Sequence, residues 1–140
     1  MKQETTVGVI SLGCAKNQVD TELMLGTLQE AGYTIVQDPA CADVLIVNTC
    51  AFIESAREEA IQTILEMAEY KNKEVGRCHV LIVAGCLAER YTKEICTELP
   101  EVDGLVGINH CDAIAQVVEL CLQGGSLPVV QVSDDYGVSY

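Results

Sequence analysis

The chain has 140 residues, and 49% of them are hydrophobic, which is enough for one domain with a packed core. No apolar run in it approaches the roughly 20 residues that a membrane-spanning helix needs. There are 21 acidic against 8 basic residues, and the formal net charge is −13. This charge argues against direct nucleic-acid binding, which needs clustered lysine and arginine, and suits a basic protein partner, although solubility alone would also account for it.

The beginning of the chain and its cysteines indicate a reducing compartment. The first six residues lead directly into an apolar run, so we expect no signal peptide and a cytoplasmic location. Eight cysteines are present, but neither a CxxC nor a CxxxCxxC spacing occurs, which argues against a zinc ribbon or a thioredoxin-type redox motif. We therefore expect reduced thiols rather than disulfides.

Short runs that are apolar on both faces alternate with helical patterns along the chain. Such runs, rich in β-branched residues, predict buried parallel strands at residues 7–11, 33–36, 44–48, 80–84 and 104–107. The helical patterns run from about 19 to just before Gly32, from 54 to 70, from 89 to 99 and from about 113 to near Gly124. This alternation predicts an α/β fold: a doubly wound, flavodoxin-like, five-stranded parallel sheet in the order 2-1-3-4-5, flanked by helices.

The residues after the last helix carry too little apolar mass for another domain. Residues 129–132 have only a weak strand pattern, and polar residues follow. We expect one domain over residues 1–125. Residues 126–140 are predicted to be a linker toward a further part of the protein that is absent from this chain.

Three cysteines share one local setting, which is the most informative feature of the sequence. Cys14, Cys50 and Cys86 each follow an apolar strand pattern by a short turn, and Gly13 and Gly85 allow the backbone to approach a bound group there. In the predicted strand order these three strands are neighbours, and their carboxyl ends meet at one edge of the sheet. Three converging thiolates in a reduced protein indicate a metal or iron–sulfur site.

The other cysteines and the histidines lack this setting. We expect the remaining cysteines to be small buried hydrophobic residues: Cys41, Cys78, Cys96, Cys111 and Cys121. His79 precedes a predicted strand at the opposite edge of the sheet, and His110 precedes the last helix, so both are expected to be structural. No catalytic triad or close pair of carboxylates can be assembled, and we expect no catalytic residue in this chain.

The loop after Cys14 leaves two interpretations open. Lys16, Asn17 and Asp20 could point into the crevice, or they could form a solvated loop in which Asn17 caps a helix. Two other protein classes with this topology are disfavoured. A receiver domain needs an acidic pocket at the strand ends, and a flavodoxin needs a Ser/Thr- and Gly-rich phosphate loop, and neither pattern is present.

Several motifs resemble those of a known family. Residues 11–22 (SLGCAKNQVDTE), 48–53 (NTCAFI) and 85–91 (GCLAERY) are similar to the motifs of the N-terminal domain of the methylthiotransferases, and the resemblance continues through residues 98–103. Within the family, the residues after the first two cysteines resemble the RimO branch, which modifies a ribosomal protein. Two departures flank the predicted ligands: Ala15 stands where that branch usually has proline, and Ala51 where it usually has glycine.

The resemblance implies a cofactor and a reaction for the full-length protein. Cys14, Cys50 and Cys86 would each ligate one iron of a 4Fe-4S cluster, and the fourth iron would be open to an exogenous sulfur. A radical-SAM domain, absent here, would add a second 4Fe-4S cluster and S-adenosylmethionine. The enzyme would add a methylthio group, using a sulfur donor, to the β-carbon of an aspartate in a basic small-subunit ribosomal protein. This chain alone is not expected to be active.

Two alternative functions remain open at this point. The chain could belong to the tRNA-modifying MiaB-type branch, which a strongly basic C-terminal region would favour. It could also be a non-catalytic iron–sulfur or metal-binding scaffold module. A structural site has four protein ligands, whereas a reactive site keeps one position open, so the coordination of the fourth iron distinguishes these alternatives.

Overall fold

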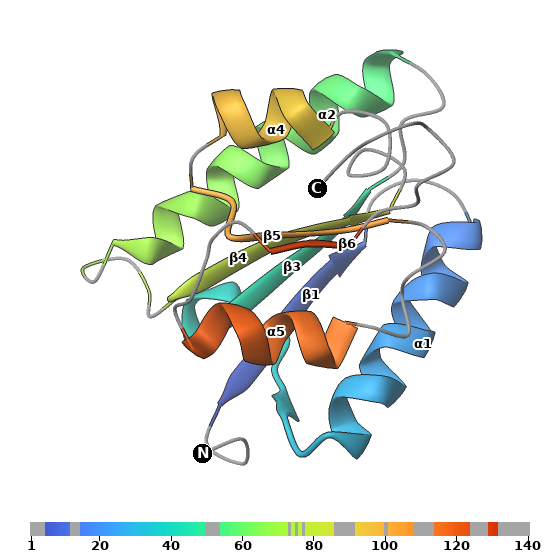
Figure 1. Ribbon diagram of the computed structural model, residues 1–140, viewed down its shortest axis with the longest axis vertical. Helices are drawn as coiled ribbons and strands as arrows, with labels where there is room; N and C mark the ends of the chain where they lie inside the picture. Colours follow the sequence, from blue (N-terminus) through green and yellow to red (C-terminus); the bar gives the residue numbers. More distant parts are fainter. Residues whose placement is uncertain are drawn as a thin grey trace.

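The protein folds around a parallel β-sheet with helices on both faces (Figure 1). The computed structural model describes residues 5–11, 15–49, 54–72, 74, 76, 78–85, 92–99, 101–107, 114–123 and 129–131. The strands are β1 (Thr6–Ser11), β2 (Thr34–Ile35), β3 (Val44–Thr49), β4 (Val80–Gly85), β5 (Gly104–Val106) and β6 (Val129–Gln131). They pair in the order β2-β1-β3-β4-β5-β6, and every pairing is parallel.

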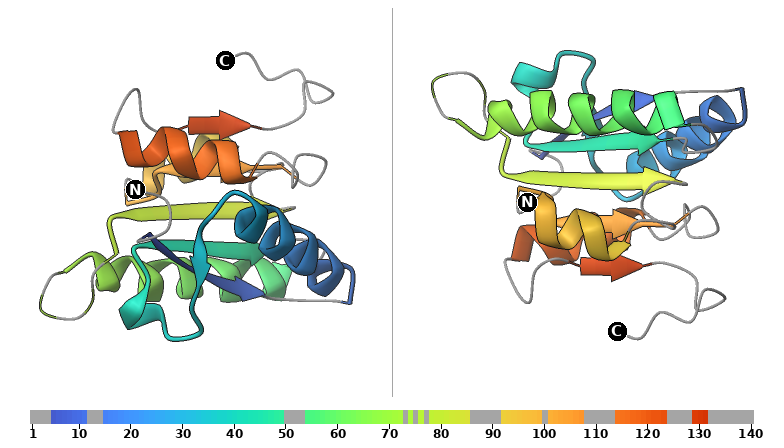
Figure 2. Two further views of the ribbon diagram at one scale, coloured as in Figure 1. Left: turned by 90° about the horizontal axis from the view of Figure 1, so that it is seen from below. Right: turned by 90° about the horizontal axis from the view of Figure 1, so that it is seen from above.

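The helices of the described residues divide into one pair for each face of the sheet. They are α1 (Ala15–Glu30), α2 (Glu54–Ala68), α4 (Thr92–Glu98) and α5 (Ile114–Gln123), with 3-10 turns η2 (Pro39–Cys41) and η3 (Glu69–Lys71). The helices α2 and α4 cover one face, and α1 and α5 cover the other (Figures 1 and 2). The fold is therefore the doubly wound arrangement that the alternating sequence pattern predicted.

Each face of the sheet contributes to its own hydrophobic core. On the α2 and α4 side, Leu45 and Leu81 of the central strands pack with Ile64, and all three are fully buried. On the α1 and α5 side, Ile46 and Ile82 of the same two strands are fully buried in the second core. Every residue of β3 and β4 is buried, which is why these strands read as continuous apolar runs rather than as alternating ones.

The end of α1 is fixed by a glycine. Gly32 has a φ of +99°, which is accessible to glycine at little cost. Its N–H donates to the carbonyl of Gln29, and the N–H of Tyr33 donates to the carbonyl of Leu28, both at 3.1 Å. This pair of bonds is the Schellman motif, which satisfies the last carbonyls of a helix and turns the chain into β2.

The predicted order of the first five strands is confirmed, and the sheet has one strand more. β6 pairs in parallel with β5, so residues 129–131 are part of the sheet, although we expected a linker over 126–140. The sheet thus extends past residue 125, the predicted end of the domain. A three-residue strand at the edge carries a weak sequence signal, because its position comes from backbone pairing with β5.

Three helix boundaries differ from the predicted ones. The helix α1 begins at Ala15, whereas the sequence pattern predicted a start near residue 19. The helix that we expected over 54–70 ends at Ala68 and continues as the 3-10 turn η3, a common ending for a helix. The helix expected over 89–99 is described from Thr92 to Glu98, and its predicted start lies outside the described residues. Among the described residues, no helix has the length and apolar character needed to cross a membrane.

Candidate metal centre

The carboxyl ends of β1, β3 and β4 form the edge at which the sequence predicts a site. These strands are neighbours and run in one direction, so they end at the same edge of the sheet (Figure 1). Ser11 at the end of β1 pairs with Asn48, and Thr49 at the end of β3 pairs with Gly85 at the end of β4. The predicted adjacency of the three strands is therefore confirmed.

The three predicted ligands lie outside the described residues: Cys14, Cys50 and Cys86. A described residue is bonded to each of them. Thr49 directly precedes the second ligand and Gly85 directly precedes the third, whereas Ala15, the first residue of α1, directly follows the first. Two of the ligands thus follow a register pair of adjacent strands. The ligand set itself stays a prediction.

Gly85 allows the ends of β3 and β4 to approach each other closely. Its φ is +96°, in the region that favours glycine. A Cβ at this position would overlap the carbonyl oxygen of Thr49 and would lie 2.8 Å from Oδ1 of Asn48. The Thr49 hydroxyl also donates to the carbonyl of Ala84 at 2.7 Å. The two strand ends are therefore held tightly at the point where the chain leads to Cys50 and Cys86.

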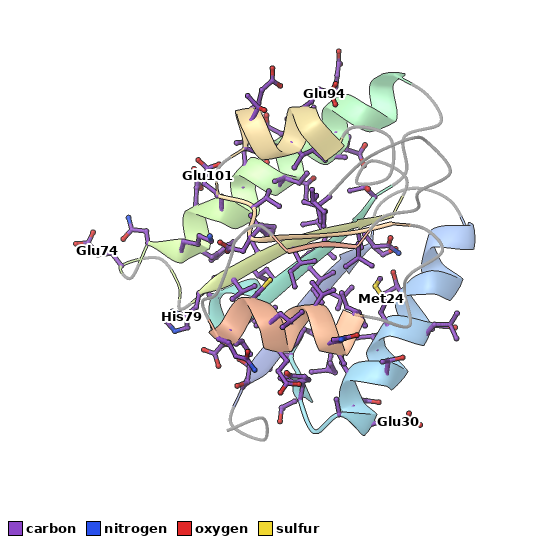
Figure 3. The ribbon with its side chains drawn as sticks, in the orientation of Figure 1. Met24, Glu30, Glu74, His79, Glu94 and Glu101 are labelled. Atoms are coloured by element: carbon purple, nitrogen blue, oxygen red, sulfur yellow. The ribbon has the colours of Figure 1, made fainter. Side chains whose placement is uncertain are left out.

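A second side-chain hydrogen bond joins β3 to α1. The side-chain amide of Asn48, which is 0% exposed, donates from Nδ2 to the Thr21 hydroxyl at 2.9 Å. Thr21 is not among the predicted site residues, although the helical pattern indicates that it faces the sheet. Thr21 is three and seven residues before Met24 and Leu28, which are both fully buried on the inner side of α1 (Figure 3 labels Met24).

Two of the remaining cysteines lie at the opposite edge of the sheet. Cys78, just before β4, is buried, and its thiol donates to the carbonyl of Val80 at 3.1 Å. Cys121 of α5 is also buried, and its thiol lies 3.4 Å from the carbonyl of Asp103, just before β5. The two thiols belong to the cores on opposite faces of the sheet, so they do not meet. For both residues, the expectation of buried structural cysteines is confirmed.

The environment of these two thiols keeps them protonated. Burial raises the pKa of the Cys78 thiol. Burial, with a smaller contribution from the charge of Asp103, raises the pKa of the Cys121 thiol to about 12. Since the thiolate is the form that binds metals and reacts with electrophiles, neither residue is suited to ligation at neutral pH.

Cys41 differs from the expectation of burial, and two other cysteines lie partly or wholly outside the described residues. Cys41 is exposed, because it closes the 3-10 turn η2 at the surface, before the chain enters the core at Ala42. The side chain of Cys96 and the whole of Cys111 lie outside the described residues. Within the described part of the chain, no three histidine, cysteine or carboxylate side chains are arranged to hold a metal ion.

The exposure of the cysteines predicts their reactivity. In the native protein at pH 8, iodoacetamide should modify Cys41 within minutes. Cys78 and Cys121 should react only after unfolding, since both are buried and a pKa of about 12 leaves Cys121 a thiolate fraction of about one in ten thousand. Peptide mapping by mass spectrometry measures each rate, with denatured protein as the control. Labelling of native Cys121 at the rate of Cys41 would contradict the described burial.

The histidine that the structure describes lies away from the candidate site. His79 is exposed and precedes β4 at the amino end of the strand, as predicted (Figure 3). Its backbone N–H donates to the carbonyl of Asp43 at 2.7 Å. His110 lies outside the described residues. Lys16, Asn17 and Asp20 belong to α1, which begins at Ala15, so the alternative of a solvated loop in which Asn17 caps a helix is wrong. The direction of these three side chains stays a prediction, because the side chains lie outside the described residues.

Comparison with known proteins identifies the family. A family model described as "Uncharacterized protein family UPF0004" matches residues 6–107, which include all three predicted ligands and the first five strands. The chain belongs to this family. The UPF0004 match ends just after β5, so the matched residues include the strand ends at which the candidate site lies.

Curated relatives of this UPF0004 chain carry a functional name. It is 60% identical over 113 residues to "Ribosomal protein uS12 methylthiotransferase RimO" of Acetivibrio thermocellus, which covers 81% of this chain and 24% of that protein. It is 54% identical over 121 residues to the protein of the same name from Pelotomaculum thermopropionicum, which covers 86% of this chain and 27% of the relative. The predicted resemblance to the RimO branch of the methylthiotransferases is therefore confirmed.

The UPF0004 chain is much shorter than these relatives. It spans about a quarter of the length of the curated relatives that it matches. The family match covers the first five strands of the sheet. The activities named for the relatives belong to proteins that are about four times as long.

Proposed function

We propose that this chain is the N-terminal cluster-binding domain of a RimO-type methylthiotransferase and that it holds a 4Fe-4S cluster through Cys14, Cys50 and Cys86. One observation carries the proposal. Thr49 and Gly85, which are bonded to Cys50 and Cys86, are a register pair on adjacent strands, and α1 begins directly after Cys14. The identity of 60% to a RimO protein supports the same assignment.

The residues around these positions fit such a group. A parallel sheet offers its ligands at the carboxyl edge, and the absence of a side chain at Gly85 lets the ends of β3 and β4 approach each other closely there. Thiolates are the usual ligands of iron–sulfur clusters. The amino end of α1, a helix of 16 residues, adds partial positive charge close to Cys14, which favours a negatively charged group there.

The residues of this domain would bind and orient, whereas the rest of the enzyme would carry the remaining chemistry. When bound, the cluster would supply an iron without a protein ligand, at which a sulfur from a donor can be carried. The three thiolates would hold the group at the edge of the sheet. The hydrogen bond between Thr49 and Ala84 would keep the strands that lead to Cys50 and Cys86 at a fixed spacing.

The full-length protein would act on a ribosomal protein. We propose that its radical-SAM domain supplies a second 4Fe-4S cluster and S-adenosylmethionine, and that an aspartate β-carbon in a small-subunit ribosomal protein receives the methylthio group. The names of the relatives specify uS12, which favours this substrate over tRNA. The net charge of −13 complements a basic partner. A cytoplasmic location is also part of the proposal.

Anaerobic reconstitution with iron and sulfide tests the cluster assignment. The wild-type chain should bind about four irons and four sulfides. Cys14→Ala, Cys50→Ala and Cys86→Ala should each lose most of this cluster, because each removes one of only three protein ligands. Cys41→Ala is the matched control, since Cys41 is an exposed cysteine on the same fold, and it should bind as the wild type does.

Two outcomes would contradict the proposal in different ways. A wild-type chain without a cluster, or a cluster that survives in all three ligand variants, would overturn the ligand set. Mössbauer spectra should show one iron that responds to added thiolate. Four equivalent irons that ignore thiolate would indicate a fourth protein ligand, and the scaffold function would then be favoured over the reactive one.

A further inference from the structure

The Thr21–Asn48 hydrogen bond connects two elements that carry predicted ligands. Thr21 is on α1, which begins directly after Cys14, and Asn48 is two residues before Cys50 on β3. The bond from Asn48 Nδ2 to Thr21 Oγ1 is 2.9 Å long and crosses from the sheet to the helix. It is thus a direct polar connection between the supports of the first and the second predicted ligand.

A second bond completes the connection across the site. The hydroxyl of Thr49 donates to the carbonyl of Ala84 at 2.7 Å, and Ala84 is two residues before Cys86. The supports of all three ligands are therefore joined in sequence by two side-chain hydrogen bonds, from α1 to β3 and from β3 to β4.

Burial makes the bond to Thr21 more than a surface contact. Asn48 is 0% exposed, and a buried side-chain amide is costly unless its polar atoms are satisfied. The apolar contacts of Met24 and Leu28 on the same side of α1 hold the helix on the sheet. Apolar packing is non-directional, whereas a hydrogen bond fixes the separation of two atoms. The hydrogen bond therefore adds a directional constraint on where α1 lies along the end of β3.

We propose that Thr21 is a positioning residue for the cluster: through Asn48, it sets the spacing between the support of Cys14 and the support of Cys50. The inference rests on the proposed function, because it requires that these cysteines bind the cluster. It extends the binding site to a residue that acts through Asn48 and does not itself ligate the cluster. Groups that hydrogen-bond directly to metal ligands commonly change metal affinity 10–100-fold when they are replaced. Since Thr21 acts one step further from the ligands, we expect an effect at the lower end of this range.

The test replaces Thr21 in the reconstituted 140-residue chain. Thr21→Val keeps the shape and removes the acceptor, and Thr21→Ser restores a hydroxyl. Thr27→Val is the matched control, because Thr27 is on the same helix and its hydroxyl donates to the carbonyl of Leu23 within that helix, at 2.9 Å. The readouts are the rate of iron release to a chelator, the EPR spectrum of the reduced cluster and the thermal unfolding of the cluster-free proteins.

The expected result separates positioning from stability. Thr21→Val should release iron roughly 10-fold faster than the wild type and should shift the EPR signal of the cluster. Thr21→Ser should behave as the wild type does, and so should Thr27→Val. Should Thr21→Val fail to fold, Thr21→Ala gives the same test, since alanine is the strongest helix former and leaves no β-branched side chain to accommodate.

Two results would overturn the inference, and they can be told apart. If the wild type binds the cluster through the three cysteines, but Thr21→Val changes only the unfolding temperature, Thr21 is structural and the proposed function stands. If the wild type assembles no cluster, the proposed function fails, and the positioning role fails with it.

Discussion

Gly85→Ala should lower the free energy of unfolding by about 2–4 kcal/mol. At a φ of +96°, alanine is strained, and its Cβ would overlap the carbonyl oxygen of Thr49 on the neighbouring strand. The atom that this Cβ would meet belongs to the backbone of Thr49 and cannot move aside as the end of a side chain could, so β3 and β4 would have to separate. Urea denaturation followed by circular dichroism measures the change.

Gly26→Ala is the matched control for this substitution. Gly26 is an exposed residue inside α1, and a Cβ there would meet no atom within 4 Å. Alanine should therefore raise the free energy of unfolding by about 0.5–1 kcal/mol, because it favours the helix. A Gly85→Ala protein that is as stable as the wild type would show that the ends of β3 and β4 are not held as closely as described.

Asp103→Ala should lower the free energy of unfolding by about 2–3 kcal/mol. Oδ2 of Asp103 accepts from the backbone N–H of Leu81 at 3.0 Å and from Nζ of Lys71 at 2.6 Å, and the backbone N–H of Asp103 donates to the carbonyl of Leu81 at 2.7 Å. Lys71 also donates to the carbonyl of Glu101 at 2.6 Å. The carboxylate thus joins the starts of β4 and β5 to the segment after α2. Alanine would remove the acceptor for the backbone N–H of Leu81 and for Nζ of Lys71.

The size of this effect depends on the partial burial of the ion pair. The side chains of Lys71 and Asp103 are 26% and 15% exposed, so solvent compensates less than it would at the surface. Glu98→Ala, at an exposed position of α4, is the control and should change the free energy of unfolding by less than about 0.5 kcal/mol. Equal losses for the two variants in urea denaturation would show that Asp103 contributes only surface charge.

The sheet could be predicted because its central strands are buried on both faces. Continuous apolar runs such as those of β3 and β4 have few structural alternatives when helical patterns separate them. Elements that are defined by strand pairing or by local backbone geometry were harder to predict from the sequence. β6 has only three residues and depends on β5 for its position. The residues that follow α2, up to and including Lys71, form the 3-10 turn η3 and do not continue the α-helix.

The candidate site, too, could be predicted from the sequence only in part. The sequence pointed to the strand ends, since Cys14, Cys50 and Cys86 follow similar apolar runs, and their side chains stay a prediction. The pairing of Thr49 with Gly85 and the bond between Asn48 and Thr21 join residues that are far apart in the chain. Such contacts leave no periodic pattern in a single sequence.

The sequence by itself determined the order of the elements, the buried character of the strands and the edge at which cysteines recur, because hydrophobic periodicity and turn residues are local properties. The tertiary structure alone decided the register at Gly85, the Thr21–Asn48 hydrogen bond and the ion pair at Asp103. These depend on the packing of α1 and the neighbouring strands to within a fraction of an ångström, which becomes fixed only when the whole sheet has formed.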